Sequence, residues 1–495
     1  MGGGAFAQAE APDAVLFHMP RMSPERYDGL RQACTERLNA YFAPAAYVIP
    51  LIDAPEKQDY GDIDFHLIST KHTDWAAVAS AIGATAFLDR GSTATQKCSF
   101  AMKLDGSPSS GPAIQYTLYH ASKPRQHPQA TDFIEGIYAQ IDVETVAPEL
   151  EKWRSFHDAY GDLSGIIGYM TTKFGFSICD KGLRLRLQEF DDASKPEWSH
   201  FKPVVDEGRI LLSSDVDRVL DFLGLSSAKY HADFVTMDEV FDWAKDCRMV
   251  SGPLGELWRK EVKTNKLKAN RSMFLDFFEN YLPARLPPAT SSPADSSSAS
   301  PSPIPLTHNN TSLIRTHRAT LLTEALDHFN RTSEYSTLHA SFLHNRLVAS
   351  ATHFLRPILA SATGKSGSSL TELLRAMRRH CAFRDGEVVV LEQRVGDTET
   401  DLGGFVEEAV DEGNGVEVRV KLKDEAKVRD WITSGGLAEV KERERRAMRE
   451  GRGEAEMPYT VPALPPYLRL ALIPQQATRM QPRKSPGDQQ DRSQK

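Results

Sequence analysis

The chain has 495 residues, of which 40% are hydrophobic and 25% are charged, as in an ordinary globular protein. Its formal net charge of −8 argues against a generally basic nucleic-acid-binding protein, although it is compatible with a local basic patch. The five cysteines are dispersed and form no CxxC pair. They indicate free thiols in a reducing compartment, rather than a disulfide framework or a zinc site. This length predicts two or three domains.

The sequence contains no recognisable targeting or membrane segment. Its N-terminal residues lack a basic stretch followed by a long apolar run, so no signal peptide is predicted. No stretch approaches the roughly 18 consecutive apolar residues that a transmembrane helix needs. We therefore expect an intracellular protein, cytoplasmic or nuclear, with no membrane association.

After a flexible N-terminus at 1–22, the first part of the chain alternates helical and strand patterns. Apolar residues recur at helical spacing after Ser23 and again after Thr73. We expect a hairpin formed by two of the strands, 99–105 and 113–120, and a helix near 148–160. The pattern predicts the fold class α/β, with a mixed sheet in the α+β sense, for a domain at 23–160. The predicted strands are 46–52, 62–68, 99–105, 113–120 and 136–146.

Beyond residue 160 the pattern becomes more helical. A helical accessory region is predicted at 161–286, with a small-residue-rich helix in LSGIIGYMTTKFG and a hairpin in FSICDKGLRLRLQ. A Pro/Ser-rich linker follows at 287–314. A mostly helical region is expected at 315–450; it includes a hairpin between EVVVLEQ and VEVRVKL and a solvent-exposed, mixed-charge helix near 424–450. A disordered tail is predicted at 451–495.

The predicted strand DIDFHLI carries two aspartates on one face. Side chains alternate across a strand, so Asp62, Asp64 and His66 share the face opposite to the apolar residues between them. Neighbouring carboxylates raise one another's pKa unless something neutralises them, and a divalent cation with oxygen ligands does so directly. Gly61, just before the pair, would allow close approach of a phosphate or backbone.

A second strand, YAQIDVETV, repeats this arrangement. Asp142 lies on its polar face, and the intervening residues are apolar. If this strand lies beside the first, Asp142 becomes a third carboxylate of one cluster. Such a cluster can hold two divalent ions about 3.5–4 Å apart, which clamp the oxygens of a phosphoryl displacement. The alternative is that Asp62 and Asp64 form the solvent-exposed face of an edge strand.

These blocks carry a family resemblance over roughly residues 45–285. The stretch KQDYGDIDF is similar to the GDxD strand of the nucleotidyltransferase (DNA polymerase beta-like) superfamily, and QIDVE resembles its third acidic position. Together with VLDFLGL and VFDWAKDCRMV, they resemble uncharacterised fungal and phage-type nucleotidyltransferase-like proteins. The resemblance implies that Asp62, Asp64 and Asp142 bind Mg²⁺ or Mn²⁺. It also implies that the protein transfers a nucleotidyl group from an NTP to an acceptor.

One feature of active members is missing. They carry a Gly-Ser pair at a helix start upstream of the acidic strand, whereas this chain has VIPLIDAPEKQDYGD there. Either Lys57 and nearby backbone groups replace that pair, or the chain is a catalytically inactive binding module of the same fold. Lys71 and Lys103 are further candidates for neutralising a triphosphate, and His66 for assisting the chemistry. A third alternative is an RNA-binding or RNA-modifying protein that contacts RNA or another polyanion through the basic segment 259–271.

Overall fold

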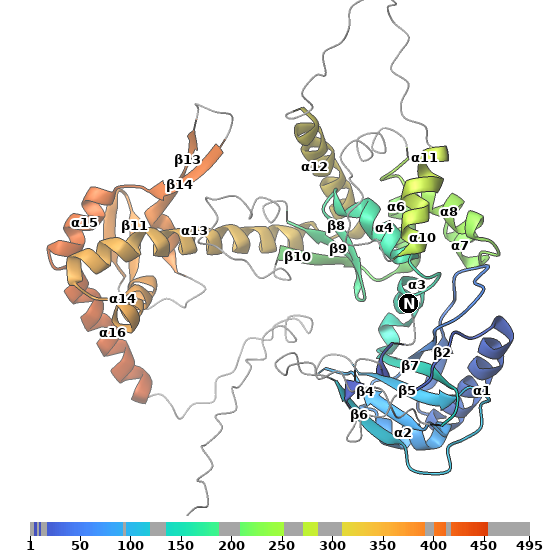
Figure 1. Ribbon diagram of the computed structural model, residues 1–495. Helices are drawn as coiled ribbons and strands as arrows, with labels where there is room; N and C mark the ends of the chain where they lie inside the picture. The colour runs from blue at the N-terminus through green and yellow to red at the C-terminus, as the bar shows by residue number, and fades with distance from the viewer. Residues whose placement is uncertain are drawn as a thin grey trace, which may run out of the picture. The chain divides into compact units, whose positions relative to one another are not determined.

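The computed structural model describes residues 4–6, 9–10, 17–92, 96–118, 135–187, 208–251, 271–285, 309–391, 400–411 and 417–453. The chain divides into two compact units, Met1–Arg346 and Leu347–Lys495, and has the expected mixed α/β content (Figure 1). None of the described helices has the length and apolar character needed to cross a membrane.

A mixed seven-stranded sheet organises the N-terminal part of the first unit. Its order is β1-β6-β4-β5-β7-β3-β2, with β3–β7 and β4–β6 parallel and the other pairs antiparallel. The expected hairpin between 99–105 and 113–120 is wrong, because the short strand β4 lies between β5 and β6. The strands are β1 (Ala9–Glu10), β2 (Tyr47–Pro50), β3 (Asp62–Ile68), β4 (Ala86–Asp89), β5 (Lys97–Lys103), β6 (Ile114–Leu118) and β7 (Tyr138–Val146).

Two helices, α1 (Pro24–Phe42) and α2 (Trp75–Ile82), bury their apolar sides against one face of this sheet (Figure 1). Ser23 occupies the N-cap position of α1 as expected, without a side-chain hydrogen bond. α2 begins at Asp74, whose carboxylate accepts hydrogen bonds from two backbone N–H groups, and ends at Gly83 with φ of +75°. The covered face contains the apolar alternate residues of β3 and β7, so their polar residues face the other way.

The region after the sheet forms a second core within the same unit. The predicted small-residue helix is α4 (Leu163–Thr172), and the predicted hairpin is β8 (Phe176–Cys179) with β9 (Gly182–Arg186). β10 (Arg209–Ser213), which the sequence pattern does not predict, extends the hairpin to three strands. The remaining elements are η2 (Pro148–Leu150), α3 (Glu151–His157), α6 (Val216–Leu223), α7 (Ser227–His231), α8 (Met237–Lys245), α10 (Ser272–Leu275), η6 (Asp276–Tyr281), α11 (Leu282–Arg285) and α12 (Asn309–Phe329).

The second unit has its own core, formed by helices around two small β-hairpins. The expected pairing of EVVVLEQ with VEVRVKL is wrong, because each of these strands pairs with an unpredicted neighbour. The division between the units falls inside α13 (Thr332–Thr363). The other elements are α14 (Gly367–His380), β11 (Cys381–Arg384), β12 (Glu387–Val390), η7 (Asp401–Phe405), β13 (Val406–Asp411), β14 (Glu417–Leu422), α15 (Glu425–Thr433) and α16 (Gly436–Gly453).

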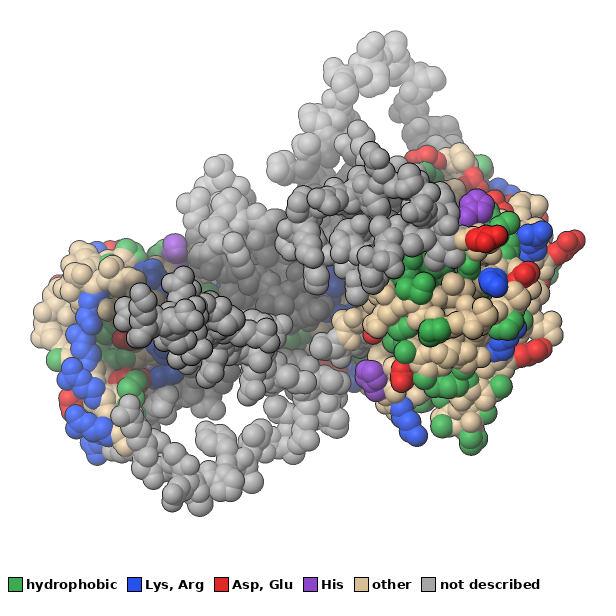
Figure 2. All heavy atoms as spheres, turned by 60° about the horizontal axis from the view of Figure 1, so that its bottom comes forward, with side chains coloured by type: hydrophobic (Ala, Val, Ile, Leu, Met, Phe, Trp, Pro, Cys, Tyr) green, Lys and Arg blue, Asp and Glu red, His purple; other side chains and the backbone are tan. Residues whose placement is uncertain are grey.

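The charged helix expected near 424–450 is present as α15 and α16. Arg429 pairs with Glu425 at 2.9 Å and Arg443 with Glu439 at 2.7 Å, both at i,i+4 spacing. Figure 2 shows a row of Lys and Arg side chains along one edge of this unit. The predicted linker lies outside the described residues up to 308, and from 309 it is helical. The tail from 454 and the basic segment at 259–270 also lie outside the described residues.

Candidate functional site

The parallel pairing of β3 with β7 brings the three predicted aspartates together. Asp64 lies opposite Asp142, and Asp62 lies opposite Gln140. Ligand oxygens of Asp62, Asp64 and Asp142 all lie within 4.8 Å of one another. The alternation that buries Ile63 and the apolar residues of β7 in the core therefore sets a carboxylate cluster on the opposite face.

The charges of this cluster are incompletely balanced. Burial, together with the nearby charges of Asp62 and Asp142 and against the opposing effect of Lys97, raises the pKa of the Asp64 carboxyl to about 7. Mutual repulsion of this kind is relieved when a cation binds. Three carboxylates in this spacing are a hard oxygen donor set, which fits Mg²⁺ or Mn²⁺.

Asp142 is held more firmly than an isolated carboxylate would be. Its Oδ1 accepts hydrogen bonds from Ser99 Oγ at 2.6 Å and Gln140 Nε2 at 3.0 Å, and its Oδ2 lies 2.5 Å from Arg90 Nη2. The Gln140 amide is oriented in turn by Ala5, whose backbone N–H donates to Oε1 at 2.9 Å. Asp142 is only 6% exposed, so these bonds fix its orientation and partly neutralise it.

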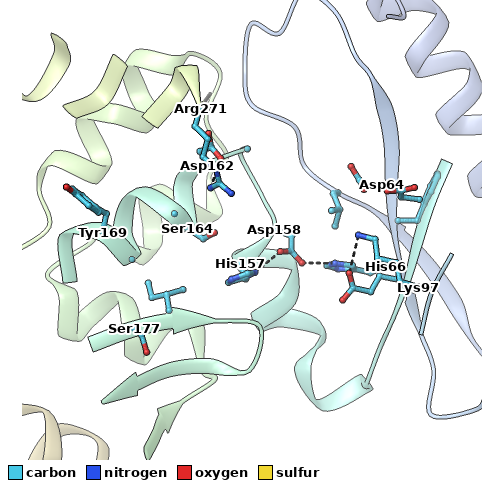
Figure 3. Close-up of a pocket in the computed structure, with 18 of the residues that line it drawn as sticks. Asp64, His66, Lys97, His157, Asp158, Asp162, Ser164, Tyr169, Ser177 and Arg271 are labelled. Atoms are coloured by element: carbon cyan, nitrogen blue, oxygen red, sulfur yellow. Dashed lines mark hydrogen bonds and ion pairs between the residues drawn. The ribbon is translucent and has the colours of Figure 1, made fainter. Parts of the chain in front are cut away.

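A cavity of about 570 Å³ opens beside the acidic cluster. Asp64, His66 and Lys97 line it from the sheet, whereas Ser164 and Ser177 line it from α4 and β8 (Figure 3). The close-up places the ion-paired end of α3 between these two walls. The sheet and the helical region thus enclose a polar cleft, with Asp64 and Asp142 on the sheet side.

No protein-family model matches this chain, and no curated protein matches its sequence. The function is therefore inferred from the side chains that surround the cleft.

Asp158 is the centre of the polar network between the two walls. Its Oδ1 lies 2.6 Å from His157 Nδ1, and its Oδ2 lies 3.0 Å from His66 Nε2. Arg154 donates to Oδ2 from Nε at 3.0 Å and Nη2 at 2.7 Å, and also contacts Glu144 at 2.9 Å. Burial opposes ionisation of Asp158, but the hydrogen bonds from His157 and His66 and the charge of Arg154 hold its carboxyl pKa well below the usual range.

On the opposite wall, the first turn of α4 carries an ion pair. Asp162, at the N-cap position of α4, makes no capping bond and instead lies 3.1 Å from Arg271 Nη1. A Cβ at Gly165 would come within 3.2 Å of the same nitrogen. The absence of a side chain at this position lets the guanidinium lie against the helix, where Arg271 lines the cavity.

The residues predicted to bind a donor phosphate lie elsewhere. Lys57 Nζ lies 2.8 Å from Asp53 Oδ1 and 4.6 Å from the ring centroid of Tyr60, so it is engaged outside the cleft. Gly61 is buried immediately before β3. Lys71 is exposed in the loop after β3, and Lys103 lines a separate hollow at the far end of β5.

Lys97 is the lysine that the structure places at the cleft. It lies opposite Glu144 in the β5–β7 pairing, and its Nζ is 3.5 Å from Glu144 Oε2. Lys97 and Ser99 alternate with apolar residues in KCSFAMK, so their polar face is visible in the sequence. The pairing of β5 with β7, which puts that face beside Asp142, cannot be predicted from the sequence pattern.

Proposed function

We propose that this chain is a metal-dependent nucleotidyltransferase that moves a nucleotidyl group from an NTP to an acceptor. The observation that carries the proposal is the set of three carboxylates within 4.8 Å on paired strands, at the edge of a polar cavity. This arrangement suits phosphoryl chemistry, because it can hold cations that stabilise charge on the transferring phosphate.

The residues of the cleft have different proposed roles. Asp62, Asp64 and Asp142 would hold Mg²⁺ or Mn²⁺, which when bound supplies Lewis-acid stabilisation of phosphate oxygens. Lys97, on the sheet side, and Arg271, on α4's side, provide positive charge toward which the anionic donor can orient. The cavity walls position the donor and reduce its contact with water.

A catalytically inactive binding module of the same fold is the second candidate. Two ion pairs favour the inactive module. Lys57 pairs with Asp53 and is therefore not available to bind a donor phosphate. Arg90 pairs with Asp142 and places a positive charge where a metal ion would bind. Such a module would bind NTP and metal without turnover.

An assay of nucleotidyl transfer distinguishes the two candidate functions. The protein is incubated with each of the four NTPs, labelled at the α-phosphate, with Mn²⁺ or Mg²⁺ and a cell extract as the source of acceptors. We expect label to appear on an acceptor. Mn²⁺ with NTP should add about 2.7 kcal/mol to the free energy of unfolding at 100 times the Kd, and so raise the melting temperature.

The Asp62→Asn plus Asp64→Asn variant should lose both responses and remain folded. The control is Asp28→Asn plus Asp180→Asn, which removes the same charge from exposed positions. Metal-dependent NTP binding without transfer would support the inactive module, and the absence of both in the wild type would refute the proposal.

A further inference from the structure

A second cavity of the first unit is separated from the cleft by α3. It has a volume of about 750 Å³, and its walls come from η2, α3, the start of α6 and the end of α7. Phe156 of α3 lines this cavity, whereas the next residue, His157, lines the cleft. Ile52 and Leu51 divide between the two cavities in the same way. We call the second cavity the acidic groove; it shares no lining residue with the cleft.

The acidic groove has an excess of negative charge. Lys152 and His231 are the basic side chains among its described lining residues, and His231 already lies 2.7 Å from Asp217. The other four carboxylates have no ion pair with any described residue, and the hydrogen bonds that they accept come from uncharged groups. Five carboxylates line the groove: Glu149, Glu151, Asp215, Asp217 and Asp233.

A buried tyrosine without a hydrogen-bond partner also lines the acidic groove. Tyr230 is 8% exposed, and its ring packs against Phe156 and Trp243, with centroids 5.2 and 5.8 Å away. Within the described part of the chain its hydroxyl makes no hydrogen bond, and it is not one of the sealed polar atoms. Buried tyrosine hydroxyls usually find a partner. This hydroxyl therefore remains available to a molecule bound in the groove.

The spacing of the carboxylates excludes a shared metal ion as the occupant. Among the described residues, the carboxylates that lie close enough to share one cation are those of the cleft, Asp62, Asp64 and Asp142. The groove instead distributes its charge around apolar surface, which includes Ile52 with 44% exposure. Arginine side chains match both features, because their stems cover apolar surface while the guanidinium groups pair with separate carboxylates.

We propose that the acidic groove binds a basic segment of a partner protein in which arginine and apolar side chains alternate. The guanidinium groups pair with the carboxylates of the groove, and an apolar side chain packs on Ile52. The Tyr230 hydroxyl forms a hydrogen bond with the bound segment. This inference goes beyond the proposed function and does not depend on it, because the groove contains no residue of the acidic cluster.

The test measures binding of a fluorescein-labelled heptapeptide of alternating arginine and leucine by fluorescence anisotropy. EDTA is present and NTP is absent, so metal binding and transfer do not contribute. Glu149→Gln plus Asp233→Asn should weaken binding about tenfold, because two ion pairs are lost. Asparagine suits position 233, where φ is +58°, and its amide oxygen can still accept the hydrogen bond from Tyr160. Added salt should weaken wild-type binding.

Tyr230→Phe tests the role of the hydroxyl separately. Because the hydroxyl has no partner among the described residues, its removal should leave the melting temperature unchanged. Peptide binding should weaken about 2–10-fold, as expected for one lost hydrogen bond. A lower melting temperature with unchanged peptide binding would show that the hydroxyl serves the fold, and would overturn its assignment to the groove.

Two control variants locate the binding. Asp28→Asn plus Asp180→Asn removes the same charge from exposed positions, and Asp62→Asn plus Asp64→Asn removes it from the cleft. Both should bind the peptide as the wild type does, and a tenfold loss in either would overturn the proposal. Equal binding of a peptide with citrulline in place of arginine would also overturn it. So would displacement of the peptide by spermidine at the concentration at which unlabelled peptide displaces it, because the groove would then be a polyamine site.

Discussion

Asp64 sits where two requirements of the chain conflict. Its strand packs an apolar face against α1 and α2, and the opposite face, which carries Asp64, lines the cavity. Its carboxyl is therefore partly withdrawn from water beside two other carboxylates, and its pKa rises to about 7. Folding in the absence of metal thus takes up about half a proton at pH 7.

This shift predicts how the stability of the metal-free protein varies with pH. Asp64 titrates near 3.9 in the unfolded chain and near 7 in the folded one, so the folded state binds more protons between these values. The free energy of unfolding contributed by Asp64 therefore falls as pH rises from about 4 to about 7, by roughly 2–4 kcal/mol. Asp64→Asn removes this loss and should be the more stable protein at pH 7.

The measurement is urea unfolding of the wild type and Asp64→Asn in EDTA across this pH range. Their stabilities should approach each other near pH 4 and diverge toward pH 7, and added Mn²⁺ should narrow the gap by stabilising the wild type alone. A difference between the two proteins that stays constant with pH would contradict the assignment of the raised pKa.

At the scale of elements, the sequence identified the two strands that carry the aspartates and missed the short strand between β5 and β6. β3 and β7 have apolar residues at every second position, so their bounds and the face carrying Asp62, Asp64 and Asp142 followed from the pattern. β4 has only four residues, three of them buried, and shows no alternation. Without β4, β5 and β6 were expected to pair directly.

The sequence also did not predict that Arg90 and Asp158 belong to the site. β4 leads into Arg90, which reaches Asp142 across 52 positions of sequence, and Asp158 meets His66 across 92. Contacts this distant depend on strand order and on where α3 ends, and no local pattern encodes either. The carboxylate cluster was therefore predictable, but the groups that contact it were not.

Arg90 should have opposite effects on folding and on metal binding. Its guanidinium compensates Asp142 in the metal-free protein, so Arg90→Gln is expected to lower the free energy of unfolding by about 1–3 kcal/mol. The same charge occupies a ligand oxygen and repels a cation, so the variant should bind Mn²⁺ about tenfold more tightly, a difference of about 1.4 kcal/mol.

Arg21→Gln is the control for this prediction, since it breaks an exposed ion pair with Asp59 at 2.7 Å and should change neither quantity appreciably. Mn²⁺ titrations followed by thermal shift give the affinity, and melting in EDTA gives the stability. Weaker Mn²⁺ binding by Arg90→Gln would instead identify Arg90 as a residue that orients Asp142 for the metal.

At the scale of the whole molecule, the two units have separate hydrophobic cores. Side chains of β3, β5 and β7 belong to one, and those of η7, α14 and α16 to another. The sequence did indicate a change of character after the mixed sheet and a distinct C-terminal part. It did not indicate that α12 packs with the helices after the sheet, because a helical pattern does not specify its partner.

Separate cores predict separate responses to core mutations. Phe405 is fully buried in the second unit, and Phe100 is fully buried under the sheet of the first. Truncating either to alanine leaves a cavity and should cost about 3–5 kcal/mol within its own unit. We expect Phe405→Ala to increase amide hydrogen exchange in α14 and α16 while β3 and β7 stay protected.

The reciprocal variant Phe100→Ala should raise exchange in β3 and β7, abolish the Mn²⁺-dependent thermal shift, and leave α14 and α16 protected. Each variant is thus the control for the other, with the same residue type removed from a different core. If Phe405→Ala also exposes the amides of β3 and β7, or weakens Mn²⁺ binding, the units unfold cooperatively. In that case the second unit would supply part of the stability on which the acidic cluster depends.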